Sequence, residues 1–155
     1  MPEGLTGDHL CSLSNRIYIL PDKPNRPLIS FGLKTKTLNH ARSPVTIDNY
    51  FDTSAIGVNN VLYVFVGWAS FKVEIDDDGD TLDSSWFQIS PIGHGGKVDF
   101  GIGELNRKIY VCGGNHEGIN FDTVRMFNID EGNWSHVASM TLARSGHGSN
   151  TLKHK

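Results

Sequence analysis

Residues 104–148 read ELNRKIYVCGGNHEGINFDTVRMFNIDEGNWSHVASMTLARSGHG, and this stretch decides the fold of the chain. Three runs of alternating apolar and polar residues lie within it, at Arg107–Cys112, Thr123–Ile129 and Trp134–Ala138, and each ends at turn-forming residues. A fourth, glycine-containing run surrounds His147. Runs of this length between Gly, Asn, Asp and Ser clusters indicate antiparallel hairpins, so the stretch predicts a sheet of four short strands.

One small sheet cannot cover both of its faces, so the sequence is expected to contain copies of this unit. Similar runs carry tyrosines spaced 45 and 47 residues apart: Tyr18, Tyr63 and Tyr110. Large apolar residues recur at intervals of 48: Leu38, Trp86 and Trp134. A period in this range, with about four strands in each unit, is typical of propeller blades.

The last unit resembles a kelch repeat, in which a tyrosine-bearing strand closes on two glycines and is followed by a polar loop, a strand and a tryptophan. The resemblance rests on Ile109, Tyr110, Val111, Cys112, Gly113, Gly114 and Trp134, and then on Met140, Arg144, Ser145, Gly146, His147 and Gly148. In the middle unit, Tyr63, Gly67 and Trp86 repeat the structural roles, but the double glycine is absent. The first unit has Pro21-Asp22 at that place, so both earlier units are assigned by period and strand pattern.

We therefore predict an all-β fold, an incomplete kelch β-propeller over residues 1–155. The blades are expected at about 5–49, 50–97 and 98–140, with an inner strand of a next blade at 145–153. The expected strands are His9–Leu13, Arg16–Leu20, Leu28–Leu33, Thr37–Ala41, Thr53–Val58, Val61–Val66, Phe71–Ile75, Ser85–Ile89 and Val98–Glu104, followed by the three runs quoted first. Closed propellers have about four to eight blades, so three blades would leave apolar flanks bare. The chain is thus expected to be a fragment of a longer protein or to complete a ring as a homodimer.

Within the last unit, we expect Tyr110 and Trp134 to lie on neighbouring strands and to pack against the adjacent blade. Gly113 and Gly114 are expected to adopt positive φ angles at the tight exit from their strand.

Composition narrows the class of protein. The net charge is −3, which argues against nucleic acid as a partner. The longest apolar run, Val61–Val66, has the length of a strand, and Met1–His9 lacks a signal-peptide core. We therefore expect a cytoplasmic protein with no membrane partner. Cys11 and Cys112 are expected to be reduced packing residues, because two cysteines form no disulfide framework.

Signals for chemistry are sparse. The seven histidines are scattered without a metal-binding spacing, and no G-x-S-x-G nucleophile turn is present. Asp76–Asp80 resembles a calcium loop, but the twelfth position is Ser85 where an EF-hand needs Glu. We therefore expect an acidic hairpin loop there, and no catalytic residue, metal or cofactor in the chain.

Binding through loops is the better hypothesis, because loops on a rigid scaffold are the usual seat of recognition. In a propeller, the connections between second and third strands and those between blades gather on one face. The exposed polar candidates on these loops are Arg144, Arg42, Lys97, His116 and Glu117. Arg144 also belongs to the kelch-like pattern, so a structural role that bridges blades stays open.

The resemblance implies a protein–protein interaction module. Many kelch propellers follow a BTB domain and a helical BACK domain and select substrates for cullin-3 ubiquitin ligases, and others bind actin. Neither a BTB-like stretch nor a helical heptad is expected in this sequence. The enzymatic alternative is a kelch-type copper oxidase or sugar mutarotase. A copper site would need converging Tyr, His and Cys side chains, for which Tyr110, His147 and Cys112 are available.

Overall fold

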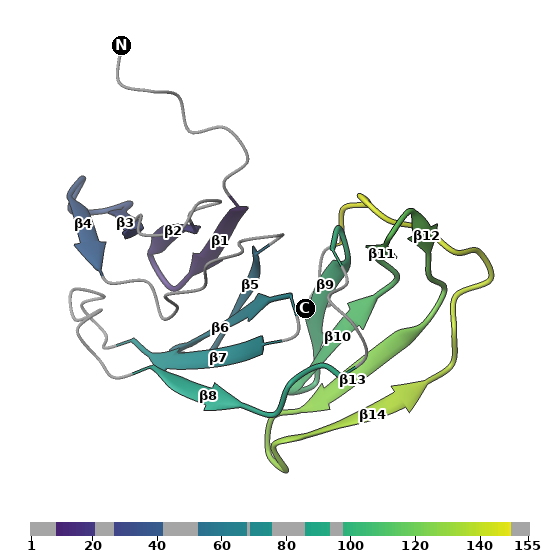
Figure 1. Cartoon of the computed structure of the whole chain (residues 1–155). Coiled ribbons are helices and arrows are strands. Elements are labelled where there is room, and N and C mark those ends of the chain that lie inside the picture. Colours follow the sequence, from purple (N-terminus) through teal and green to yellow (C-terminus); the bar gives the residue numbers. More distant parts are fainter. Residues whose placement is uncertain are drawn as a thin grey trace. The chain divides into compact units, whose positions relative to one another are not determined.

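The computed structural model describes residues 9–20, 27–41, 53–67, 69–75, 86–93 and 98–149. Within these ranges there is no α-helix, and the strands form three four-stranded sheets and one two-stranded hairpin (Figure 1). The prediction of an all-β fold built from four-stranded antiparallel blades is confirmed. The chain divides into two compact units, Met1–Val66 with Phe71–Gln88 and Gly67–Ser70 with Ile89–Lys155.

The first two sheets follow the chain order. The first has the order β1-β2-β3-β4, formed by β1 (His9–Leu13), β2 (Arg16–Leu20), β3 (Leu28–Gly32) and β4 (Leu38–Ala41). The second has the order β5-β6-β7-β8, formed by β5 (Thr53–Val58), β6 (Val61–Val66), β7 (Ala69–Glu74) and β8 (Phe87–Ile89). Strands β1, β2, β5 and β6 have the predicted bounds, and the other four differ from the prediction by one or two residues at an end.

The third sheet has the order β14-β13-β10-β9, formed by β9 (Gly101–Leu105), β10 (Lys108–Cys112), β13 (Val124–Asn128) and β14 (Asn133–Val137). Its fourth strand is therefore β9, and the run around His147 does not join this sheet. Residues 145–149 have no strand assignment, and the rest of the predicted inner strand, 150–153, lies outside the described residues. The β10–β13 connection contains a hairpin that the sequence did not predict, β11 (Asn115–His116) and β12 (Ile119–Asn120).

Strand registers show that the three sheets are copies of one unit. In each sheet the repeated tyrosine pairs with the residue seven positions before it: Tyr18 with Cys11, Tyr63 with Ile56 and Tyr110 with Gly103. We call the side of each sheet that carries this tyrosine the tyrosine face, and the other side the reverse face.

The outer strands obey the same correspondence. A row of paired residues crosses the reverse face of the first sheet at Ile17, Phe31 and Leu38. The matching row of the third sheet is Ile109, Phe127 and Trp134. Leu38 is therefore the structural counterpart of Trp134, as their spacing in the sequence predicted.

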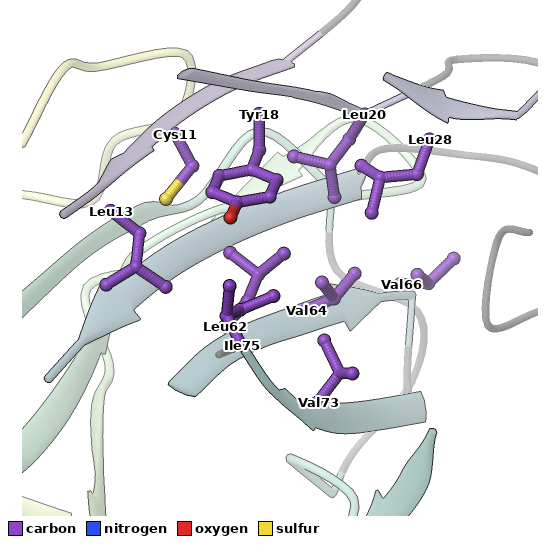
Figure 2. Close-up of a cluster of buried hydrophobic side chains, with 10 residues drawn as sticks. All are labelled: Cys11, Leu13, Tyr18, Leu20, Leu28, Leu62, Val64, Val66, Val73 and Ile75. Atoms are coloured by element: carbon purple, nitrogen blue, oxygen red, sulfur yellow. The ribbon is translucent and has the colours of Figure 1, made fainter. Parts of the chain in front are cut away.

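The main core lies between the first two sheets (Figure 2). The tyrosine face of the first sheet contributes Cys11, Leu13, Tyr18, Leu20 and Leu28, and the second sheet contributes Leu62, Val64, Val66, Val73 and Ile75. Tyr18 is 1% exposed and Leu62 is fully buried. Full burial of one such side chain stabilises the fold by about 1.5–3 kcal/mol, so this layer is the main source of stability in its unit.

Close approach of the two sheets requires a glycine in β5. A Cβ atom built at Gly57 would lie 2.7 Å from Cβ of Leu13, which is shorter than any real contact of this kind. The small residue in this inner strand therefore permits the packing, as close approach in an inner strand requires. Cys11 lies in the same layer, and burial raises the pKa of its thiol to about 11. Within the described residues both cysteines are free, and Cys11 is a buried packing residue.

Tyr110 and Trp134 do not lie on neighbouring strands, contrary to the prediction. Strand β13 separates β10 from β14, because each of these strands pairs with the next one of the sheet in chain order. Tyr110 pairs with Met126, whereas Trp134 pairs with Phe127, so the two aromatic residues point to opposite faces. The Trp134 ring packs on Phe127 with centroids 5.2 Å apart, and its Nε1 donates a hydrogen bond of 2.8 Å to the Ser90 carbonyl.

Truncation of Tyr18 should show how much this core contributes. We predict that Tyr18→Ala lowers the free energy of unfolding by about 3–5 kcal/mol, because it leaves a cavity between two sheets. Leu33→Ala is the control, since Leu33 is 41% exposed in the β3–β4 turn, and should cost less than about 1 kcal/mol. Urea unfolding followed by tryptophan fluorescence measures both values. Equal losses in the two variants would contradict the assignment of the core.

Candidate interaction surface at the loop end of the third sheet

Two glycines direct the chain out of β10. Gly113 and Gly114 have φ angles of 66° and 102°, a region that L side chains rarely adopt, which confirms the prediction for this pair. A Cβ atom at Gly113 would lie 2.4 Å from the carbonyl oxygen of Arg144. The position therefore needs glycine both for its backbone angle and for the close approach of a second segment.

The hairpin β11–β12 follows directly. Its turn is Glu117-Gly118, with φ angles of 50° and 82°, as a two-residue turn of the type I′ class requires. The Asn115 side chain closes the hairpin: its Oδ1 accepts a hydrogen bond of 3.0 Å from the Gly118 amide, and its Nδ2 donates one of 2.8 Å to Oδ1 of Asn120.

The segment after β14 is hydrogen-bonded to this connection (yellow trace beside β11 and β12 in Figure 1). The Arg144 amide donates to the Phe121 carbonyl at 3.0 Å, and the Arg144 carbonyl accepts from the Gly114 amide at 2.9 Å. The Ser145 hydroxyl donates to Oδ1 of Asn120 at 2.9 Å. Both backbone groups of Arg144 therefore tie the two segments together.

A third segment, just before β9, joins the same network. Val98 and Asn115 exchange backbone hydrogen bonds of 2.9 and 2.8 Å, and the Gly146 amide donates to the Asp99 carbonyl at 2.8 Å. The three segments that meet at this end of the sheet are therefore held by direct bonds. These hydrogen bonds fix the backbone positions from which the loop side chains project.

The side chains displayed here include both polar or charged groups and large apolar groups. The loop surface is defined by His116, Glu117, Ile119, Leu142 and Arg144. Ile119 and Leu142 are 65% and 66% exposed, large values for apolar residues. His116 and Ile119 are a cross-strand pair in the hairpin, so their side chains share one side of it. Exposed leucine or isoleucine next to arginine is a composition that suits a protein partner.

The loop surface contains three of the five side chains predicted to bind a partner, His116, Glu117 and Arg144. Arg42 and Lys97 lie outside the described residues. Ile119 and Leu142 were not predicted, because the exposure of a single apolar residue leaves no pattern in the sequence. Tyr110, Gly113 and Gly114 shape the sheet and its exit and do not belong to the surface.

The residues available for a copper site are only partly brought together. Tyr110 and Cys112 lie on the tyrosine face, and the ring of His147 lies over Gly101, which pairs with Cys112. Burial raises the pKa of the Cys112 thiol, which disfavours the thiolate that a metal needs. Among the described residues, no group of three or more His, Cys, Asp or Glu side chains could hold a metal ion. Within the same ranges, no helix is long and apolar enough to cross a membrane.

Three register-equivalent, four-stranded antiparallel sheets are the architecture of β-propeller blades. Comparison with protein families identifies the kind of blade: residues 97–141 match the family model described as the kelch motif. This range contains the whole third sheet and its loop hairpin, so this part of the chain matches a kelch repeat. A search of curated proteins finds no match to the chain.

The energetic cost of the close approach at Gly113 can be measured separately from the cost of its positive φ angle. Gly118 also has a positive φ, but a Cβ there meets nothing within 4 Å. We predict that Gly118→Ala costs about 1–2 kcal/mol of unfolding free energy from the angle alone. Gly113→Ala should cost about 1–3 kcal/mol more, because the new methyl group meets the Arg144 carbonyl. Chemical denaturation of the two variants measures the difference, and equal costs would show that segment 139–149 does not pack on Gly113.

Proposed function

We propose that this chain is a non-catalytic interaction module that binds a protein partner through the loop surface. Kelch repeats generally mediate protein–protein binding, and the matched range, 97–141, includes His116, Glu117 and Ile119 of this surface. The observation that supports the proposal most strongly is the exposure of two large apolar side chains and an arginine on loops tied by backbone hydrogen bonds. Such an arrangement reduces the conformational entropy that binding would otherwise cost.

The chemistry of the surface indicates what the partner presents. Arg144 can donate two parallel hydrogen bonds to a carboxylate, and Leu142 lies two residues before it. Glu117 is 84% exposed in its side chain and lies next to His116, at 4.0 Å between Oε1 and Nε2. We therefore expect a partner segment that combines an Asp or Glu with an apolar anchor, because arginine is enriched at interface hot spots and such residues bind in well-packed, desolvated pockets.

The finer forms of the proposal follow the family resemblance. One is recognition of substrates for a cullin-3 ubiquitin ligase, and the other is binding of actin, both in the cytoplasm. A copper oxidase or mutarotase activity has no observation in its favour among the described residues. Stoichiometric copper in the purified protein, measured by mass spectrometry of the metal, would overturn the non-catalytic assignment.

Cross-linking capture tests the loop surface. We predict that Arg144→Glu combined with Leu142→Asp removes at least about nine-tenths of the partner captured by the wild-type chain, since each 1.4 kcal/mol lost is tenfold in affinity. The control is Glu131→Arg, which reverses one charge, as Arg144→Glu does, but at an exposed position in the β13–β14 turn, at the opposite ends of the strands. Quantitative mass spectrometry of captured proteins gives the ratio.

The control decides how the result is interpreted. Loss with the double variant and retention with Glu131→Arg supports binding at the loop surface. Equal retention in all three proteins would place the binding elsewhere on the chain. Enrichment of cullin-3 or of actin would choose between the two finer forms.

A further inference from the structure

The tyrosine face of the third sheet is less covered than its counterparts. Tyr18 and Tyr63 are 1% and 4% exposed, whereas Tyr110, at the equivalent register, is only half-buried. At the margins of the same face, Leu105 is 52% exposed and Val137 is 36% exposed. The first sheet shows what this face looks like when another sheet packs on it. Among the described residues, the third sheet has segment 145–149 over its β9 edge, where the His147 ring lies on Gly101, but no second sheet packed on the face.

The reverse face of the first sheet is uncovered in a matching way. Ile17 and Phe31 are half-buried and Leu38 is 53% exposed. In the third sheet, Ile109 and Phe127 occupy the positions equivalent to Ile17 and Phe31. These two residues are only 0% and 2% exposed. The first sheet therefore presents an apolar reverse face, and the third presents a tyrosine face on which the apolar residues Leu105, Tyr110 and Val137 are partly exposed beside the polar Asn128, Asn133 and Ser135.

We propose that these two faces bind each other between copies of this chain. The tyrosine face of the third sheet in one copy would dock on the reverse face of the first sheet in another. The template is the junction already present in the chain, where the tyrosine face of the first sheet packs on Leu62, Val64 and Val66 of the reverse face of the second. By strand register, Tyr110 takes the place of Tyr18 in the new junction, and Ile17 and Ile19 take the places of Leu62 and Val64.

The composition of the two faces fits this junction. The strand residues on the reverse face of the first sheet are Leu10, Ser12, Ile17, Ile19, Ile29, Phe31, Leu38 and His40, with no Asp, Glu, Lys or Arg. The strand residues on the tyrosine face of the third sheet include one charged residue, Lys108. Lys108 occupies the position that corresponds by register to the buried Arg16 in the first sheet. Depletion of charge is typical of the core of an interface.

The geometry of association follows from the identity of the faces. Each copy offers one face of each kind, so the contact is heterologous: the two surfaces that meet are different. Such contacts either close into a ring or extend as a chain. This inference rests on exposure and register and is independent of the proposed loop function, which uses other residues.

Light scattering on variants tests the proposal. The wild-type chain should associate in a concentration-dependent way, and Ile19→Asp or Tyr110→Asp should each raise the dissociation constant at least about tenfold, because each buries a charge in an apolar junction. Glu131→Arg, outside both faces, should leave it unchanged. An equimolar mixture of the two aspartate variants should associate more strongly than either alone, since one junction in the mixed pair joins two unaltered faces.

Thiol labelling of the wild-type chain gives a second readout that needs no variant. Cys112 lies on the tyrosine face of the third sheet and is half-buried, whereas Cys11 is in the core of the other unit. Alkylation of Cys112 should become several-fold faster on dilution below the dissociation constant, while Cys11 stays unreactive and reports an intact fold. A monomer at all concentrations, with labelling independent of dilution, would overturn the proposal and assign the two faces to a different polypeptide segment. Association without rescue in the mixture would also overturn it, because the contact would then not be head-to-tail.

Discussion

The packing of the tyrosine face of one sheet on the reverse face of the next is the interaction on which the rest of this structure depends. A four-stranded sheet with two apolar faces is not stable alone in water, so each unit needs a neighbour on both sides. Between the first and second sheets this need is met by a layer whose central side chains, Tyr18 and Leu62, are 1% and 0% exposed. The same requirement explains why the chain repeats, and why the two partly exposed sheet faces are the ones proposed to associate.

The loop surface is a consequence of how the third sheet ends. Gly113 and Gly114 turn the chain sharply out of β10, and the backbone of Arg144 then bonds on both sides of the resulting connection. These bonds satisfy the peptide groups of irregular segments, which would otherwise need water. The exposed side chain of Arg144 can then make other contacts. In this repeat, backbone groups and glycines form the framework, and the side chains of the loops are displayed from it.

Much of this fold could be predicted from the sequence because the repeat spacing and the alternation within strands are direct results of sheet geometry. The spacing of Leu38, Trp86 and Trp134 placed the units, and it corresponds to a real equivalence between Leu38 and Trp134. Strand order within a sheet leaves no such mark, which is why Tyr110 and Trp134 were assigned to neighbouring strands. The exposure of Ile119 and Leu142 could not be predicted either, since it depends on segments distant in the sequence that are joined by backbone hydrogen bonds.

The stability of this structure depends on the contact between the first two sheets, and methyl–aromatic nuclear Overhauser spectroscopy measures that contact most directly. The structure predicts cross-peaks from the Tyr18 ring to methyl groups of Leu62 or Val64, residues 44 and 46 positions away that lie in the same buried cluster. Face-to-face packing would be contradicted if the Tyr18 ring gave cross-peaks only to residues of its own sheet and if the backbone amides of β6 exchanged their hydrogens rapidly with solvent. That result would remove the basis for treating the three sheets as blades of one propeller.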